Sequence, residues 1–146
     1  KYRKERLPNV CVMTPMCRSF GGRSRMSCSL HPETFQHNYD TDDAPLAKFA
    51  GQVAYEQLVD DLDVVNEQPT GSSLCETEPW PAVLQHPRVT SEKFDQCQLG
   101  QRNSKGEHVK KPAELVASGS DLLCYVRGLK CGKFRKRCNG NRNCPN

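Results

Sequence analysis

The segment APLAKFAGQVAYEQLVDDLDVVNEQP, residues 44–69, decides the fold because it joins the clearest helix pattern of the chain to a clear strand pattern. In residues 44–62 apolar side chains recur every three or four positions, which is the period of an amphipathic helix. These side chains are Leu46, Phe49, Ala50, Val53, Ala54 and Leu58. Asp42 or Asp43 can cap the start of this helix, and Pro45 suits its first turn. Residues 63–69 then predict a short strand that ends at Pro69.

Strands and shorter helices are predicted on both sides of this segment. Runs of β-branched or alternating apolar residues predict strands within 10–14, 88–100 and 114–118. Short helices are predicted within 78–87, with Pro near its start, and within 119–129, capped by Ser120. Residues 18–43 lack periodicity and predict a long loop. The alternation of strands and helices predicts an α/β protein with a partial Rossmann-like βαβ sheet, in which ligands gather at the carboxyl ends of the strands.

Length and composition suit one loop-rich domain. The chain has 146 residues, 36% of them hydrophobic, and a mean hydropathy of −0.74. No apolar run approaches the roughly 20 residues of a membrane-spanning helix. We expect a basic arm at 1–8, an α/β domain at 9–129 and a basic, Cys-rich tail at 130–146. The chain starts without Met and without a signal peptide, so we expect a processed piece of a longer protein.

The charge pattern points to an anionic partner. Residues 1–25 carry seven Lys or Arg and one acid, residues 33–79 carry eleven acids and one Lys, and seven Lys or Arg with no acid follow residue 122. Basic ends suit a nucleic acid or an acidic protein surface. The alternative is that these charges are solvated faces and tails. The residues expected to contact phosphates are Arg18, Arg23, Arg25, Lys133, Arg135, Lys136 and Arg137.

Two residues are the candidate catalytic pair. Cys17 follows the strand at 10–14, and Glu67 lies near the end of the strand at 63–69. If these strands are parallel neighbours, both residues lie at one edge of the sheet. A thiolate next to a carboxylic acid suits covalent attack on an electron-poor ring. The alternatives are a small buried thiol at Cys17 and a cap or loop carboxylate at Glu67.

At these positions the chain resembles a known family. PMCRSFG (15–21) is similar to the Pro-Cys nucleophile loop of cytosine-C5 DNA methyltransferases, and NEQP (66–69) resembles their Glu-Asn motif. The closer resemblance is to a methyltransferase-like domain of retrotransposon polyproteins. The motifs that carry it, in order, are Thr14-Pro15-Met16-Cys17, Glu67-Gln68-Pro69, Trp80, Asp95-Gln96-Cys97, Lys110-Lys111-Pro112-Ala113 and Cys138-Asn139-Gly140.

The resemblance implies the carboxyl-terminal half of a methyltransferase-like fold. It implies that Cys17 attacks C6 of cytosine, that Glu67 contacts N3 and the exocyclic amine, and that S-adenosylmethionine supplies the methyl group. No Gly-rich strand–turn–helix unit precedes Asn9, and Arg18 and Gly21 depart from the nucleophile-loop pattern. We therefore expect no S-adenosylmethionine binding and no catalysis by this chain alone. The other function that we consider is a non-catalytic structural or interaction subunit of a larger assembly.

Nine cysteines point to thiol or metal chemistry. The number is odd and no secretory signal is present, which favours thiols over a disulfide framework and an intracellular, nuclear or organellar, location. Cys97, Cys131, Cys138 and Cys144 are the candidate ligands of a four-thiolate zinc site. The alternatives are a disordered basic tail or disulfides.

Overall fold

The computed structural model describes residues 8–22 and 24–131, without the side chain of Arg25. The basic arm, Arg23 and the rest of the Cys-rich tail lie outside the described residues. The strands are β1 (Val10–Met13), β2 (Asp63–Pro69), β3 (Val89–Asp95) and β4 (Pro112–Ser118). The helices are α2 (Ser24–Leu30), α3 (Pro32–Asn38), α4 (Ala44–Val59) and α5 (Trp80–Leu84). One π-helical turn, Tyr39–Asp43, joins α3 to α4, and 3-10 turns lie at Ser73–Glu76, Gln96–Leu99 and Ser120–Leu123.

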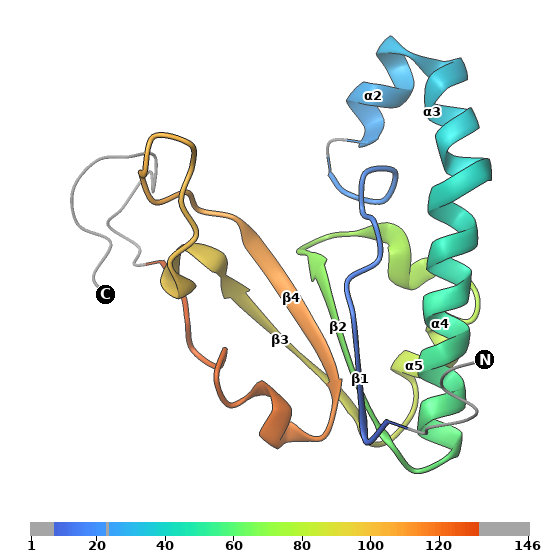
Figure 1. Ribbon diagram of the computed structural model, residues 1–146, viewed down its shortest axis with the longest axis vertical. Helices are drawn as coiled ribbons and strands as arrows, with labels where there is room; N and C mark the ends of the chain where they lie inside the picture. The colour runs from blue at the N-terminus through green and yellow to red at the C-terminus, as the bar shows by residue number, and fades with distance from the viewer. Residues whose placement is uncertain (1–7, 23, 132–146) are drawn as a thin grey trace.

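The four strands form one mixed sheet in the order β1-β2-β4-β3. β1 is parallel to β2, with Val10 opposite Asp63 and Met13 opposite Asn66. β4 is antiparallel to both β2 and β3. Figure 1 shows α4 running beside β1 and β2, while α2 and the connection between β3 and β4 extend at the same end of the molecule, on opposite sides of a gap. The protein is therefore an α/β protein in which one long helix joins the two parallel strands.

Small residues on α4 determine how closely it packs. Ala47, Ala50 and Ala54 are buried in one core cluster together with Leu58 of the same helix; the other members of the cluster are Phe20, Val64, Leu74, Trp80 and Val83. The fully buried Trp80 donates from Nε1 to the carbonyl oxygen of Ala47 at 2.9 Å. This hydrogen bond satisfies the indole N–H inside the core.

Alternation along β2 separates two cores. Val64, Asn66 and Gln68 are buried, and Val64 packs in the α4 cluster. Val65 packs against a second cluster on the other face, formed by Phe94, Ala113, Ala117, Leu123 and Val126. Because successive strand residues point to opposite faces, Glu67 shares the face of Val65.

Most of the predicted elements are confirmed, with two corrections to their arrangement. All four predicted strands are present, α4 and α5 match the helices predicted within 44–62 and 78–87, and β2 has the predicted bounds. The helix predicted within 119–129 is wrong, because that segment holds only a 3-10 turn at Ser120–Leu123. The expected βαβ arrangement holds for β1, α4 and β2, whereas β3 and β4 are antiparallel. The connection between β3 and β4 holds only a 3-10 turn and an isolated β-bridge, and so provides no crossover helix of the kind that parallel strands need.

The long loop predicted at 18–43 is wrong, because α2, α3 and the π-helical turn occupy most of it. None of the residues of α3 is buried, so its sequence carries no apolar period from which a helix can be recognised. The predicted caps are also wrong. The side chain of Asp43 makes no capping hydrogen bond to α4, and Gly119, not Ser120, precedes the last 3-10 turn.

No helix in residues 8–22 and 24–131 is long and apolar enough to cross a membrane.

Candidate functional site

The loop that carries Cys17 is a hydrogen-bonded turn after β1. The carbonyl oxygen of Cys17 accepts from the backbone N–H of Phe20 at 3.1 Å and of Gly21 at 2.8 Å. A Cβ atom at Gly21 would lie 3.1 Å from that same oxygen, so the turn favours glycine there. Phe20 is buried in the α4 core cluster, and this packing holds the loop against the core. Gln68 on β2 donates from Nε2 to the carbonyl oxygen of Pro15 at 3.2 Å. Cys17 is thereby held at the carboxyl ends of the two parallel strands.

A buried carboxylate ties this loop to the start of α4. Asp43 is fully buried and accepts a hydrogen bond from Ser19 Oγ. Arg18 Nε lies 3.0 and 3.1 Å from the two oxygens of Asp43, and Arg18 Nη2 lies 2.8 Å from Asp42 Oδ2. These hydrogen bonds, the one to Asp43 first, raise the pKa of Arg18 above its ordinary value. Arg18, a predicted phosphate contact, thus already faces two carboxylates.

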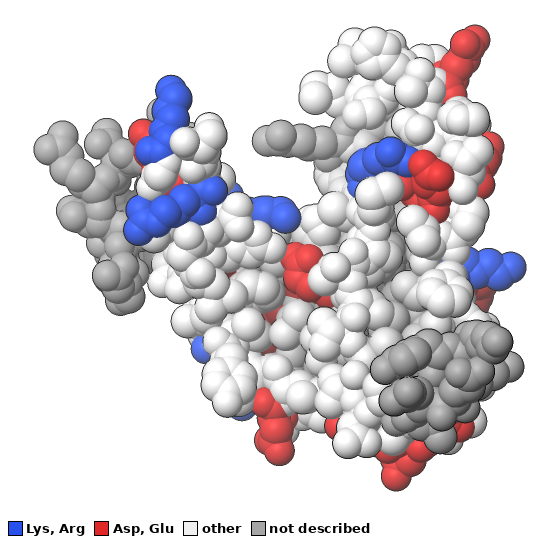
Figure 2. All heavy atoms as spheres, in the orientation of Figure 1, with Lys and Arg blue, Asp and Glu red and all other residues white. Residues whose placement is uncertain are grey.

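A cleft of about 540 Å³ lies beside Cys17. The Cys17 loop forms one wall, the end of β2 at Pro69 and Thr70 contributes to its lining, and the residues leading into β4 form the opposite wall. That opposite wall consists of Gln101, Val109, Lys110, Lys111 and Pro112. Figure 2 shows the hollow between the two sides of the molecule, with Lys and Arg side chains gathered on one of them.

The lysines of this cleft were not among the predicted contacts. The sequence places Lys110 and Lys111 about 90 residues after Cys17, and only the pairing of β4 with β2 brings them opposite it. The feature of the sequence that could have identified these lysines is the local charge. Residues 100–111 hold Arg102, Lys105 and both of these lysines, with Glu107 as the one acid.

Glu67 is in β2 as predicted, but its side chain bonds elsewhere. Its Oε1 accepts from Gln96 Nε2 at 2.9 Å. In the part of the chain that the structure describes, Glu67 is not among the residues that line the Cys17 cleft. The parallel pairing of β1 and β2 thus brings the Cys17 loop to the strand that holds Glu67, but Pro69 and Thr70, and not Glu67, line the cleft beside Cys17.

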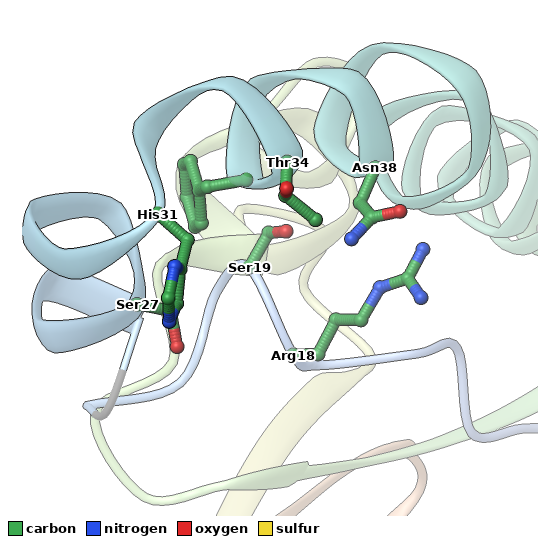
Figure 3. A pocket seen from close by; sticks show the side chains of 7 residues that line it. Arg18, Ser19, Ser27, His31, Thr34 and Asn38 are labelled. Atoms are coloured by element: carbon green, nitrogen blue, oxygen red, sulfur yellow. The ribbon is translucent and has the colours of Figure 1, made fainter.

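A smaller hollow of about 220 Å³ is also lined by Arg18. In Figure 3, Ser19 and Arg18 of the loop face Thr34 and Asn38 of α3 across it, and His31 closes one end. His31 is exposed.

Two of the four predicted zinc ligands are adjacent. Cys97 Sγ and Cys131 Sγ are 3.5 Å apart, and both residues are buried. Cys131 is disulfide-bonded, and Cys138 and Cys144 lie outside the described residues. In residues 8–22 and 24–131 no group of three or more His, Cys, Asp or Glu side chains is arranged to hold a metal ion. The other predicted phosphate contacts, Arg23, Lys133, Arg135, Lys136 and Arg137, also lie outside that range, as does the side chain of Arg25.

Asp95 links this sulfur pair to the cleft. Its Oδ2 accepts from the backbone N–H of Cys131 at 2.7 Å and lies 3.8 Å from Lys110 Nζ.

Comparison of the chain with protein-family models, with curated proteins and with solved structures finds no match, so its family is not assigned by similarity.

Proposed function

We propose that this chain is a degenerate methyltransferase-like, retroelement-related domain that binds nucleic acid and does not transfer methyl groups alone. The observation that carries the proposal is the cleft in which Cys17 faces Lys110 and Lys111. A cleft at the carboxyl ends of parallel strands is where α/β sheets bind ligands, and lysines attract phosphates. The sheet order, with one parallel pair and a last strand inserted antiparallel, is compatible with the carboxyl-terminal half of a methyltransferase-like sheet.

The position of Glu67 supports the absence of catalysis. The resemblance assigns Glu67 to the cytosine ring, yet this carboxylate is hydrogen-bonded to Gln96. Cys17 in turn has Arg18 beside it, whose charge is compensated by Asp42 and Asp43. A thiol without the partner carboxylate lacks the group that would stabilise an attacked ring.

The test is a titration of the full chain against labelled single- and double-stranded DNA at several salt concentrations. We expect the logarithm of the association constant to fall linearly with the logarithm of salt. Cys17→Ser should bind as the wild type does, because a thiol contributes no phosphate contact. Binding that is absent or indifferent to salt would overturn the proposal. Methyl transfer from S-adenosylmethionine that is lost in Cys17→Ser would overturn the statement that the chain is inactive.

We further propose a zinc site of Cys97, Cys131, Cys138 and Cys144 in the reduced protein. Two thiolates on tetrahedral zinc lie about 3.8 Å apart, given Zn–S bonds of about 2.3 Å. The 3.5 Å between Cys97 Sγ and Cys131 Sγ is close to that value. Because Cys131 is disulfide-bonded, zinc binding requires its reduction.

Metal analysis after purification under reducing conditions tests the zinc site. We expect about one zinc per chain, lost in Cys97→Ser and retained in Cys28→Ser, since Cys28 is exposed and separate from the pair. A reduced wild type without zinc would remove the site.

The second candidate function is an interaction subunit, and the position of β1 at one end of the sheet of described strands favours it. β1 is at one end of the sheet, and Val12 is 69% exposed on it. Unpaired strand edges with apolar side chains accept further strands. In this function β1 pairs with a strand of another subunit.

A further inference from the structure

The connection between β3 and β4 folds into an ordered hairpin, defined here as residues 101–109. Arg102 and His108 form an isolated antiparallel bridge, and Val109 N–H donates to the carbonyl oxygen of Gln101 at 3.2 Å. At the tip, Asn103 Oδ1 accepts from the backbone N–H of Lys105 at 2.9 Å and of Glu107 at 3.0 Å. Local hydrogen bonds of this kind define a turn without help from a core.

This hairpin and the two residues preceding β4 carry a strong positive charge. Residues 100–111 hold four cations, Arg102, Lys105, Lys110 and Lys111, against the single acid Glu107. Glu107 accepts a hydrogen bond from Asn103 Nδ2 at 2.8 Å. Figure 2 shows this positive charge on the side of the hollow that faces the α2 end of the molecule.

Two of the four cations already interact with groups of the protein, and the other two do not form ion pairs in the described ranges. Lys110 lies 3.8 Å from the buried carboxylate of Asp95, and Arg102 donates from Nη1 to the carbonyl oxygen of Gly106 at 2.7 Å. Lys105 and Lys111 form no ion pair with any residue of the described ranges, and both are exposed. Their charges are therefore available to a ligand.

We propose that this hairpin, together with the two lysines that precede β4, is the phosphate-binding element of the protein, with Lys105 and Lys111 as the contacts and Arg102 and Lys110 as positioning residues. The inference rests on the proposed nucleic-acid binding and names the surface that performs it. Lysine ammonium groups bind phosphates as point charges. Six residues of chain separate Lys105 from Lys111, so their Cα atoms lie at most about 20 Å apart at about 3.3 Å per residue, and the turn at the hairpin tip shortens this distance. The two lysines can therefore contact phosphates of one strand that are no more than about six positions apart, at about 3.4 Å each.

The experiment compares four single variants of the full chain: Lys105→Gln, Lys111→Gln, Lys110→Gln and Lys48→Gln. Lys48 is the matched control, because it is an exposed lysine on α4, away from the hairpin. Each of Lys105→Gln and Lys111→Gln should reduce the magnitude of the salt slope by about 0.9 on duplex DNA, or about 0.7 on a single strand. Lys48→Gln should leave the slope unchanged, and Lys110→Gln should change it less than Lys111→Gln does.

Two results would overturn the inference while leaving nucleic-acid binding in place. One is a wild-type slope in both Lys105→Gln and Lys111→Gln, which would place the phosphate contacts elsewhere. The other is an equal loss of affinity in Lys48→Gln, which would show a nonspecific effect of net charge. Polyglutamate that displaces an oligonucleotide of equal charge at equal concentration would identify an acidic protein as the partner and overturn the inference. Failure of the wild type to bind any oligonucleotide would overturn the proposed function itself.

Discussion

Gly51 is the residue at which α4 comes closest to the segment that begins α5. A Cβ atom there would lie 2.9 Å from Pro79 Cδ and 3.0 Å from Trp80 Nε1. Trp80 is fully buried and held by its hydrogen bond to Ala47, and Pro79 precedes it directly in the chain. Because neither ring can move without disturbing the core, the position excludes any side chain.

Gly51→Ala should therefore destabilise the fold by about 1–3 kcal/mol, despite the higher helix propensity of alanine. Urea unfolding of the full chain measures the change. Gly22→Ala is the matched control, since a Cβ at Gly22 has nothing within 4 Å, and its effect should stay within about 0.5 kcal/mol. Equal stability of the two variants would show that α4 and α5 adjust without cost.

The Cys75 thiol should be unreactive at neutral pH. Burial, followed by the charges of Glu114 and Glu76, raises its pKa from 9.0 to about 11. At pH 8 about one molecule in a thousand then carries the thiolate, which is the reactive form. Alkylation followed by mass spectrometry should label the exposed Cys28 and Cys124 well before Cys75.

The raised pKa of Cys75 also makes the stability of the fold depend on pH. The folded state favours the neutral thiol of Cys75, so its contribution is complete below about pH 9 and is lost as the pH rises through about 11. Cys75→Ser should flatten the fall in stability across that interval. Rapid labelling of Cys75 in the native protein at pH 8 would contradict both statements.

At the scale of elements, β1 is one of the two end strands of the sheet of described residues, and it carries an exposed apolar side chain at Val12. If β1 pairs with a strand of a second copy or another subunit, Val12→Lys should abolish that association and leave the stability of the fold within about 0.5 kcal/mol. Light scattering over a range of concentrations measures the association of the chain with itself. Tyr125→Lys, at an exposed aromatic residue outside the sheet, is the control. A wild type that is monomeric at every concentration would argue against a second copy as the partner.

The elements also show how far the sequence predicts this fold. β2 and the start of α4 were predictable because their apolar residues face a core, as Val64, Ala47 and Ala54 do. α2 and α3 were not predictable, because their helical structure depends on contacts such as the stacking of Phe35 on Tyr39 and not on a buried apolar face. An apolar period in the sequence reveals a helix only where one face is buried, and these two helices bury little of their surface.

At the scale of the whole molecule, the candidate site shows a similar division. The meeting of the Cys17 loop with the end of β2 follows from one parallel strand pair, which the helix between them made predictable. The opposite wall, with Lys110 and Lys111, depends on the antiparallel insertion of β4 between β2 and β3. No local pattern encodes which strand a later strand will join, so half of the cleft could not be predicted.

The carboxylate of Asp95 has a thermodynamic consequence for the whole molecule. Asp95 Oδ2 accepts the hydrogen bond from Cys131 N–H and also lies near Lys110 Nζ. Ligand binding at Lys110 and changes at Cys131 therefore both act on the same carboxylate charge. A ligand that draws Lys110 toward itself changes how strongly Asp95 holds the chain at Cys131. By reciprocity, a change at Cys131 that alters its hydrogen bond to Asp95, such as reduction of its disulfide, alters the affinity at the cleft by the same factor.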